Sequence, residues 1–395
     1  MSKWFDLEAK YYMKTFKRQP VVLVRGEGAR VWDEEGKCYL DMVAGLAVNI
    51  LGHAHPAVVE AISSQASKLI HTTNLYYTIP QLEAAELLIS SSCADRVFFG
   101  NSGAEANEGA IKLARKYGRL NRNGAYETIS VENSFHGRTL TTLAATGQAK
   151  FQAPFAPMPN GFKIVPFNDL DALKAATSDS TCAVLLEVIQ GESGVNLADG
   201  DYLRGVRRWC DEKGLLLIFD EIQTGMGRTG KFLSFEHYGI EPDVFTMAKG
   251  LAGGVPIGAV LAKEPVAVFG PGDHGSTFGG NPLACAASVA TLRTLFEERL
   301  IERAARVGAY LLQAIRRLQD RYPFVEGARG LGLMAAFDLK SDLAGNVVAA
   351  ALGKGLLLNN PGPRTVRMLP PLIISEGEVD ETISILDQVL SQLAS

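Results

Sequence analysis

A carboxylate and an amine each follow a short apolar run in the middle of the 395-residue chain. Leu215–Phe219 is followed by Asp220, and Val244–Ala248 is followed by Lys249. Each run is too short for a helix and is bounded by glycine or proline, so we predict two buried strands of a parallel sheet. Ligands of open α/β sheets bind beyond the carboxyl ends of the strands, which makes both side chains candidates for a functional site.

The simplest interpretation of such a pair is a buried ion pair, because buried charges are usually paired. The neighbouring residues favour chemistry instead. Lys249 is followed by Gly250, Gly253 and Gly254, which let other groups approach the amine closely. This layout suits a lysine that forms a Schiff base with pyridoxal phosphate (PLP) and an aspartate that keeps the pyridinium nitrogen protonated. We therefore predict that Lys249 and Asp220 are catalytic.

The same two segments resemble a known family. Class III (ornithine-type) PLP-dependent aminotransferases carry motifs similar to FDEIQTGMGRTG and MAKGLAGGVPIGA, and the resemblance extends through nearly the whole chain. It implies the type I fold of PLP-dependent transferases, an α/β fold with a mainly parallel, doubly wound sheet and a smaller α+β domain. We expect an N-terminal arm at 1–55, a large PLP-binding domain at 56–290 and a C-terminal small domain at 291–395. The small domain would combine the N- and C-terminal segments.

A candidate phosphate site precedes these strands. The predicted strand Arg96–Phe99 leads into GNSGAEANEGAIKLARKYG, which has helical periodicity. Small residues at a strand-to-helix turn leave backbone N–H groups free to hold an anion, although an ordinary capped helix has the same pattern. With Lys249 downstream, we favour a phosphate site made by Ser102, Gly103 and Ala104. The stretch is similar to the family's SGTEAN motif, with alanine in place of threonine, so one hydroxyl contact is removed.

The resemblance implies further contacts with the cofactor. Phe135 would stack on one face of the ring, Ile222 would pack on the other, and Gln223 would hydrogen-bond the ring hydroxyl. Ser276 and Thr277 would reach the cofactor phosphate of a partner subunit, which implies a homodimer with shared sites. Local sequence alone explains the same residues as a core aromatic and glycine-rich loops.

Substrate binding is assigned by the same resemblance to two arginines and a glutamate. Arg138 in NSFHGRT would bind a substrate carboxylate, and Arg367 in PRTVRMLPPLIIS would bind the α-carboxylate of glutamate or 2-oxoglutarate. Glu192 in QGESGV would neutralise Arg367 when a substrate brings one carboxylate, and Glu187 would support the backbone of that loop. On local sequence alone, each arginine is equally a surface or strand-edge residue. The resemblance places Tyr76 and Tyr77 near the entrance of the site as candidate substrate contacts, although loop packing explains them equally, and His136 stays without an assigned role.

The acetylornithine group of the family is the most similar in the opening segment RGEGARVWDEEGKCYLDMVAGLAVNILGHAHP and the closing segment VRMLPPLIIS. The resemblance therefore implies transfer of the δ-amino group of N2-acetylornithine to 2-oxoglutarate, giving N-acetylglutamate 5-semialdehyde and glutamate in arginine biosynthesis. Scaffold similarity leaves ornithine, succinylornithine and 4-aminobutyrate open as donors. An aminomutase on the same fold and a catalytically silent ligand-binding protein are further alternatives.

The remaining elements are expected along the whole chain. We predict further strands, the first two paired as a hairpin, at Ala29–Trp32, Cys38–Met42, Thr128–Glu132, Ala183–Ile189, Val260–Ala262, Gly330–Asp338 and Leu356–Leu358. We predict helices at Pro56–Leu69, Pro80–Leu88, 201–213, Asn281–Leu318 and Glu378–Leu393. The alternation of strands and helices around Asp220 fits a doubly wound sheet.

Composition argues against several other classes of protein. The chain is 47% hydrophobic and 21% charged with a net charge of −4, so we expect neither nucleic acid nor a membrane surface as a partner. Five scattered cysteines and a polar N-terminus predict a reduced, cytoplasmic chain. No segment reaches about 18 consecutive apolar residues, so no membrane span is expected. His53 and His55 lack a third ligand at metal spacing, so we expect no metal.

Overall fold

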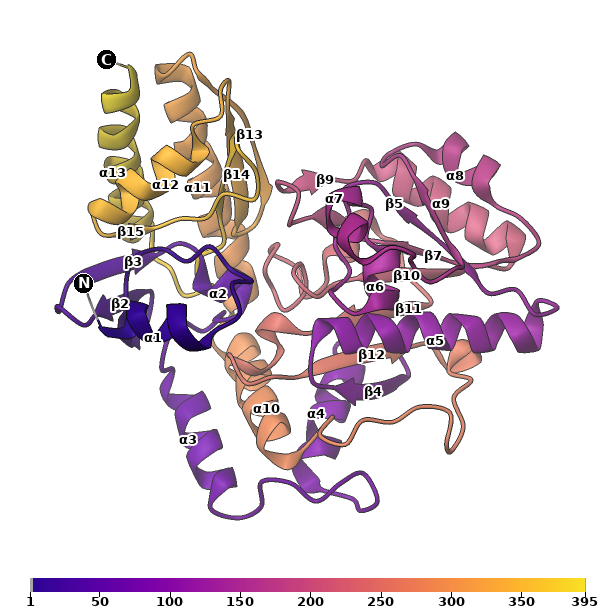
Figure 1. Cartoon of the computed structure of the whole chain (residues 1–395). Helices are drawn as coiled ribbons and strands as arrows, with labels where there is room; N and C mark the ends of the chain where they lie inside the picture. Colours follow the sequence, from indigo (N-terminus) through magenta and orange to yellow (C-terminus); the bar gives the residue numbers. More distant parts are fainter. Residues whose placement is uncertain (1–2, 395) are drawn as a thin grey trace.

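The structure is a computed structural model that describes residues 3–394, and its centre is a seven-stranded sheet (Figure 1). The strand order is β4-β12-β11-β10-β7-β5-β6. β12 is antiparallel to both of its neighbours, whereas the other pairs are parallel. The predicted mainly parallel sheet is therefore confirmed. Its strands are β4 Arg96–Gly100, β5 Glu127–Val131, β6 Phe162–Val165, β7 Thr181–Leu186, β10 Leu216–Asp220, β11 Val244–Met247 and β12 Gly258–Ala262.

Helices cover both faces of this sheet, which explains why its central strands are continuous apolar runs. Every residue of β7, β10, β11 and β12 is buried. Successive side chains of a strand point to opposite faces. Leu216 and Ile218 accordingly pack in the cluster that contains α5 (Gly103–Asn121), whereas Leu217 and Phe219 pack in the cluster that contains α9 (Gly200–Lys213). Both faces of the sheet are thus part of the core.

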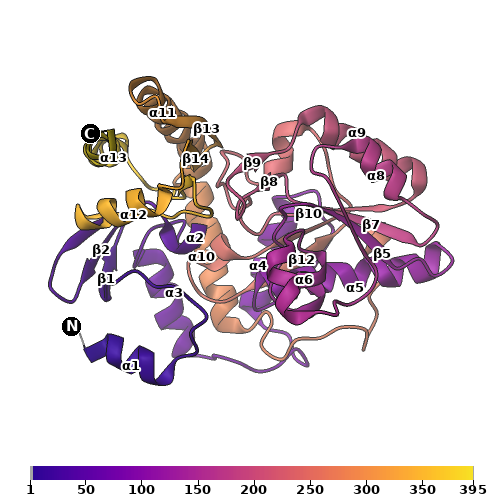
Figure 2. The same cartoon turned by 45° about the horizontal axis from the view of Figure 1, so that its top comes forward.

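The two ends of the chain meet in a second unit, seen beside the large sheet in Figures 1 and 2. A four-stranded sheet joins three N-terminal strands to one from near the C-terminus, and a three-stranded sheet lies in the C-terminal part. The first contains β1 Leu23–Glu27, β2 Arg30–Asp33, β3 Cys38–Asp41 and β15 Leu356–Leu357, and the second contains β13 Val325–Leu331, β14 Met334–Leu339 and β16 Thr365–Met368. The predicted N-terminal hairpin is confirmed as β2 and β3.

The remaining helices pack around these sheets. They are α1 Lys3–Tyr11, α2 Ala44–Ala47, α3 Pro56–Ala66, α4 Ile79–Ser90, α6 Leu140–Ala145, α7 Ala149–Gln152, α8 Leu170–Ala176, α10 Pro282–Glu297, α11 Leu300–Arg321, α12 Ala344–Gly353 and α13 Glu376–Ala394. Short 3₁₀ turns occur at Ala153–Phe155, Ser234–Tyr238, Lys249–Ala252 and Glu264–Val266. Within residues 3–394, none of the helices has the length and apolar character needed to cross a bilayer.

Two predicted elements are each divided in the structure. The helix expected over Asn281–Leu318 is two helices, α10 and α11, because Arg299 between them adopts a left-handed conformation with φ of 53°. The strand expected over Gly330–Asp338 belongs to two paired strands, β13 and β14, which turn at Gly332 with φ of 55°. A positive φ interrupts both regular repeats, and an arginine gives no sequence signal for it.

A third division shapes the functional site. The strand expected over Ala183–Ile189 stops at Leu186, and a two-residue strand, β8 (Ile189–Gln190), pairs with β9 (Asn196–Leu197). The chain therefore leaves the large sheet at Glu187 and forms a separate hairpin. Glu192 lies at the tip of that hairpin, between the large sheet and the second unit.

Candidate active site

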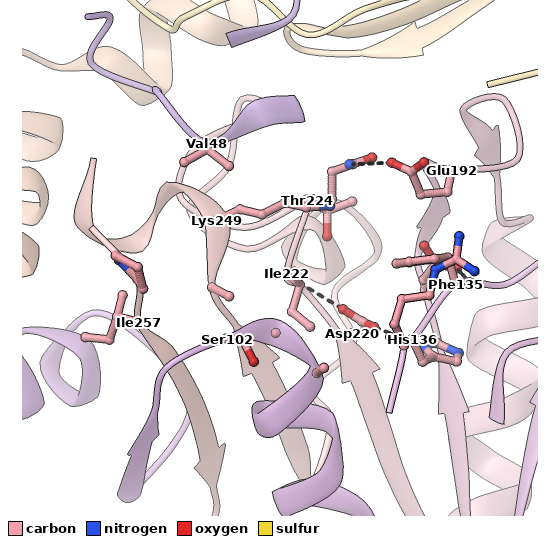
Figure 3. Close-up of a pocket in the computed structure, with 18 of the residues that line it drawn as sticks. Val48, Ser102, Phe135, His136, Glu192, Asp220, Ile222, Thr224, Lys249 and Ile257 are labelled. Atoms are coloured by element: carbon pink, nitrogen blue, oxygen red, sulfur yellow. Dashed lines mark hydrogen bonds and ion pairs between the residues drawn. The ribbon is translucent and has the colours of Figure 1, made fainter. Parts of the chain in front are cut away.

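The carboxyl end of β10 places Asp220 in the wall of a cavity of about 380 Å³ (Figure 3). Asp220 Oδ2 accepts a hydrogen bond from Asn107 Nδ2 at 2.7 Å and lies 2.8 Å from His136 Nδ1. Its Oδ1 accepts one from the backbone N–H of Ile222 at 3.1 Å. With the Nδ1–H tautomer of His136, three donors hold this buried carboxylate in one orientation.

Asn107 is a functional candidate that sequence reasoning misses. Its Nδ2 also donates to the carbonyl oxygen of His136 at 2.8 Å, and its Oδ1 accepts from Thr246 Oγ1 at 2.8 Å. The side chain is fully buried on the face of α5 that otherwise presents Ala110, Ile111 and other apolar residues to the sheet. A polar residue on the apolar face of a helix is the signal that could have found it. His136, which has no role assigned from sequence, also belongs to this network.

Lys249 follows β11 and opens a 3₁₀ turn with a left-handed φ of 38°. It is partly buried, and its Nζ makes no hydrogen bond to any residue that the structure describes. Burial lowers the pKa of Lys249, and the positive charge of Arg367 adds to this effect, although Glu192 and Asp220 oppose it. The cavity therefore contains an unpartnered amine that loses its proton more readily than an ordinary lysine.

The turn between β4 and α5 forms one end of the same cavity. Ser102 caps α5, because its Oγ accepts a hydrogen bond from the Glu105 N–H at 3.2 Å. The first intrahelical bond runs from Ala106 N to Ser102 O at 3.0 Å, which leaves the N–H groups of Gly103 and Ala104 available. A Cβ on Gly103 would lie 2.9 Å from Ile222, so only glycine lets this turn approach the side chain. These features are those of an anion site at a helix N-terminus.

Ser276 and Thr277 lie elsewhere within one chain. Neither lines the cavity around Asp220. Ser276 Oγ accepts hydrogen bonds from Asn101 Nδ2 at 3.0 Å and from Gly279 N at 3.1 Å. Thr277 lines a small hollow with His71 and Thr78. The structure therefore does not bring these two residues to the cavity of their own chain, which is the placement expected if they serve a partner.

Arg367 and Glu192 meet at the opposite side, where the second unit faces the hairpin. Arg367 lies in β16, is 1% exposed and contacts Glu192 Oε1 through its Nη1 at 3.1 Å. Burial opposes the ionised form of Glu192, but the charges of Arg367 and Lys249 outweigh it and lower the pKa of this carboxyl. The predicted pairing of Arg367 with Glu192 is thus present in the structure.

Ile222 and Gln223 both line the cavity, as the resemblance implies. Gln223 Nε2 lies 3.4 Å from Glu192 Oε1, whereas its Oε1 is buried and has no partner among residues 3–394. A Cβ at Gly191 would lie 1.7 Å from that Oε1, so glycine is needed beside it. Gln223 therefore offers an unused acceptor to a ligand.

Arg138 lies at the mouth of the cavity and packs against two aromatic rings. Its guanidinium lies 3.9 Å from the centre of the Phe151 ring and 5.4 Å from that of Phe135. The side chain is exposed and forms no ion pair with a described carboxylate. Cation–π contact orients the charge without neutralising it, so Arg138 is free to bind a carboxylate. Phe151 is a second residue that sequence reasoning misses.

Glu187 lies where the chain leaves β7, and it too lines the cavity. Its Oε2 accepts a hydrogen bond from the backbone N–H of Phe135 at 2.9 Å, so it supports that segment and not the 190–195 hairpin expected from the resemblance. Burial and the nearby charge of Asp220 raise the pKa of Glu187 well above its ordinary value. Tyr76 and Tyr77 are exposed and lie outside the cavity.

The histidine pair has no metal-like environment. His53 Nε2 lies 2.7 Å from Asp41 Oδ2, and His55 Nε2 lies 3.8 Å from Glu298. Within the part of the chain that the structure describes, no three His, Cys, Asp or Glu side chains are grouped so as to hold a metal ion.

The groups in the cavity fit PLP. A helix N-terminus is available for a phosphate, a buried carboxylate for a ring nitrogen, and an unpartnered amine for an aldehyde carbon. Ile222 and Phe135 provide apolar surface for the ring, and the unpartnered Gln223 Oε1 would accept a hydrogen bond from its hydroxyl. A cleft with no ligand would leave the buried Gln223 Oε1 without a hydrogen bond, which is costly, so this atom indicates that a ligand binds here.

Comparisons with known proteins agree with this geometry. The sequence profile of the family described as aminotransferase class-III matches residues 11–390. An acetylornithine aminotransferase of Caldanaerobacter subterraneus is 53% identical, covering 98% of both chains. One from Methanocaldococcus jannaschii is 52% identical, covering 99% of this chain and 98% of its own.

Solved structures share the whole fold. An ornithine aminotransferase from Toxoplasma gondii superimposes with a TM-score of 0.95 at 35% identity, covering 99% of this chain and 95% of its own. An acetylornithine aminotransferase from Elizabethkingia anophelis gives a TM-score of 0.88 at 35% identity and covers 98% of both chains. The similarity thus includes the large sheet, the second unit and every side of the cavity.

Proposed function

Because the chain belongs to the PLP-dependent class III aminotransferase family, we propose that it transfers the δ-amino group of N2-acetylornithine to 2-oxoglutarate. The products are N-acetylglutamate 5-semialdehyde and glutamate. The observation that carries the proposal is the ion pair between the buried Arg367 and Glu192, because Glu192 lines the same cavity as Lys249 and Asp220. With this pair, one cavity can accept two kinds of substrate. A substrate with one carboxylate leaves Glu192 on Arg367, and a substrate with two carboxylates takes the place of Glu192.

When bound at Lys249, PLP supplies an electron sink for negative charge at the substrate carbon. Once the substrate amine has taken the place of Lys249 on the cofactor, the freed Lys249 Nζ would accept a proton from that carbon and return it to the cofactor side. Its lowered pKa suits this role, because a general base works best when its pKa lies near the working pH. Asp220, fixed by Asn107 and His136, would pair with the ring nitrogen and stabilise its protonated form.

Two arginines orient the substrate carboxylates. Glutamate has two carboxylates and would use both Arg138 and Arg367. N-acetylornithine has one, far from its reacting δ-amine, and would use Arg138 at the cavity mouth. Glu192 then remains on Arg367 and prevents an uncompensated buried charge, which would be costly. Arginine suits both positions because its planar fork matches a carboxylate.

Half-reactions test the donor. Each candidate donor is added alone to the PLP form of the enzyme, and the loss of visible absorbance is followed with time. We expect N-acetylornithine and glutamate to react faster than 4-aminobutyrate. If none of the amines changes the spectrum, the proposed reaction is wrong.

Ornithine is the second candidate donor. The observation that favours it is the TM-score of 0.95 to the ornithine aminotransferase of Toxoplasma gondii. The relatives with about half of their residues identical carry the acetylornithine name instead, which supports our first choice. A half-reaction that is faster with ornithine than with N-acetylornithine would reverse this order and leave the chemistry unchanged.

We also propose that the protein works in the cytoplasm as a homodimer, in which Ser276 and Thr277 contact the partner's cofactor phosphate. Their position outside the cavity of their own chain and the exposed Phe278 beside them support the shared site.

The five cysteines are all unpaired, as is usual in a reducing compartment, which supports the cytoplasm. The division at 1–55, 56–290 and 291–395 is likewise proposed, and the sheet that joins β3 to β15 supports it.

A further inference from the structure

Asn359 is a side chain in contact with Arg367 to which no role has been assigned so far. It follows β15, and its backbone forms an isolated antiparallel bridge with Arg367, whose N–H donates to Asn359 O at 2.7 Å. The side chain repeats this contact. Asn359 Oδ1 accepts hydrogen bonds from Arg367 Nε at 3.0 Å and from Nη2 at 2.6 Å. A single amide oxygen therefore occupies one whole edge of the guanidinium.

The other edge of Arg367 has different partners. Its Nη1 donates to the backbone carbonyl of Gly191 at 2.6 Å and to Glu192 Oε1 at 3.1 Å. Arg367 is thus fixed by two residues that carry no charge and touches one that does. A neutral oxygen can orient a guanidinium but leaves its positive charge uncompensated, whereas a carboxylate does both.

The two members of the ion pair differ in how firmly they are held. The Arg367 side chain is 1% exposed and has four hydrogen bonds, whereas the Glu192 side chain is 27% exposed. Apart from Arg367, the only hydrogen bond of the Glu192 carboxylate within residues 3–394 is the 3.4 Å contact from Gln223 Nε2. Glu192 is therefore the partner that can be displaced, and Arg367 is the one that stays.

We propose that Asn359 is a positioning residue that fixes the orientation of Arg367 and keeps its charge available, so that a dicarboxylic substrate displaces Glu192 and meets an arginine already in place. The neutrality of the amide is the essential property. An aspartate at 359 would have almost the same shape, but it would pair permanently with the guanidinium. The proposal rests on the proposed use of Arg367 for the second carboxylate of glutamate and 2-oxoglutarate.

The test compares two unreactive acids on the holoenzyme. Glutarate has two carboxylates and valerate has one, and neither has an amine, so calorimetry measures binding without turnover. We expect Asn359→Asp to raise the dissociation constant of glutarate at least about 30-fold. This is the scale expected when a buried charge loses its partner. Valerate binding should change by less than about 3-fold. Asn168→Asp is the control for an added negative charge, because within residues 3–394 the Asn168 side chain forms hydrogen bonds only with Leu197 and Asp199.

Two other variants separate positioning from a general structural role. Asn359→Ala removes the acceptor without adding charge and should weaken glutarate by a smaller factor, about 3- to 10-fold. Glu192→Gln should strengthen glutarate binding in the natural background, because it removes a competitor for Arg367. It should have no such effect together with Asn359→Asp, where the arginine is already neutralised.

Several outcomes would overturn the proposal. Natural glutarate affinity in Asn359→Asp would show that the neutrality of residue 359 does not matter. Equal losses for glutarate and valerate would show that the residue only supports the fold, and if Asn359→Asp does not fold, Asn359→Ala applies the same criterion. Failure of N-acetylornithine as a donor would remove the proposed donor while leaving these binding results valid, so the two proposals fail separately.

Discussion

The two sides of the cavity are built in opposite ways. The Asp220 carboxylate has three partners at 2.7–3.1 Å, and Asn107, His136 and Thr246 around it are buried, with His136 Nε2 the atom of this network that has no partner among residues 3–394. Around the substrate, Glu192 is partly exposed and Arg138 has aromatic neighbours but no carboxylate. The cofactor side is therefore fixed before any ligand binds, whereas on the substrate side a carboxylate of a ligand can replace Glu192 at Arg367 or bind to the unpaired Arg138.

The largest expected effect comes from the amine that both sides share. Lys249→Ala removes the group that would bind PLP and carry the proton, so we expect turnover to fall at least about 10³-fold. The thermal unfolding temperature should stay close to that of the natural protein, because Lys249 makes no hydrogen bond in the described structure. Steady-state assays and thermal melts would measure both. Lys263→Ala is the control, since that lysine pairs with Glu241 outside the cavity; turnover that survives in Lys249→Ala would disprove the assignment.

The next effect tests the fixed side. Asp220→Asn keeps the shape but removes the charge that stabilises a protonated ring nitrogen, so we expect kcat to fall roughly 10²-fold or more. PLP affinity, measured by titration of the apoenzyme, should also fall. Asp243→Asn is a matched control, because Asp243 lies at the other end of the parallel strands and bonds Arg207 and Leu217. A kcat as high in Asp220→Asn as in this control would contradict the role.

A smaller and selective effect is expected on the exchangeable side. Glu192→Gln leaves Arg367 without its counter-ion when the substrate has one carboxylate. The kcat/KM of the half-reaction with N-acetylornithine should therefore fall about 10-fold. The half-reaction with glutamate should not weaken, because glutamate brings its own carboxylate to Arg367. Rapid-mixing spectroscopy with each donor measures the ratio. Equal losses with both donors would mean that the two sides are not built differently in this respect.

The smallest effect appears in stability and not in catalysis. Glu221 is fully enclosed and accepts hydrogen bonds from Thr224, Ser234 and Phe235, and burial raises its pKa to about 7. The folded state therefore favours its protonated form, and the stability that this gives is present below about pH 4.5 and lost as the pH rises through 7. The difference between pKa values of 4.5 and about 7 corresponds to at most about 3.4 kcal/mol.

Glu221→Gln would measure that contribution, because glutamine does not titrate. We expect the stability of the natural protein relative to this variant to fall between pH 4.5 and 7.5, as read from paired thermal melts. Parallel pH profiles for the two proteins would show that Glu221 does not titrate in this range. KM for both substrates should stay unchanged, since every side-chain hydrogen bond of Glu221 within residues 3–394 comes from the loop that follows β10.

The sequence predicts the fixed side better than the exchangeable side. Asp220 and Lys249 end apolar runs, so strand geometry alone brings them to one edge of the sheet. Asn107 lies in a segment whose pattern looks like ordinary helix and Phe151 in one for which no element is predicted, and their roles depend on contacts with His136 and Arg138 in another segment of the chain. Periodicity reports which face of an element is apolar, but not which polar side chains meet across it.

The points at which predicted strands and helices are interrupted were also not predictable from the sequence pattern. The break of β7 after Leu186 and the helix break at Arg299 both occur at residues that are neither glycine nor proline. The first of these creates the hairpin that carries Glu192, so the exchangeable side depends on a feature that has no local sequence signal. The resemblance to a family supplied Arg138, Glu192 and Arg367, which the residues alone left as ordinary charged positions.

The pairing of β3 with β15 has a consequence for how the molecule is assembled during synthesis. Cys38–Asp41 leaves the ribosome early, yet its partner Leu356–Leu357 is among the last segments to be made. The edge of β3 that pairs with β15 therefore has no partner until well after the last strand of the large sheet, which ends at Ala262, has been made. Unpaired strand edges are where nascent chains associate wrongly, so this early segment is the part that most needs protection until translation ends.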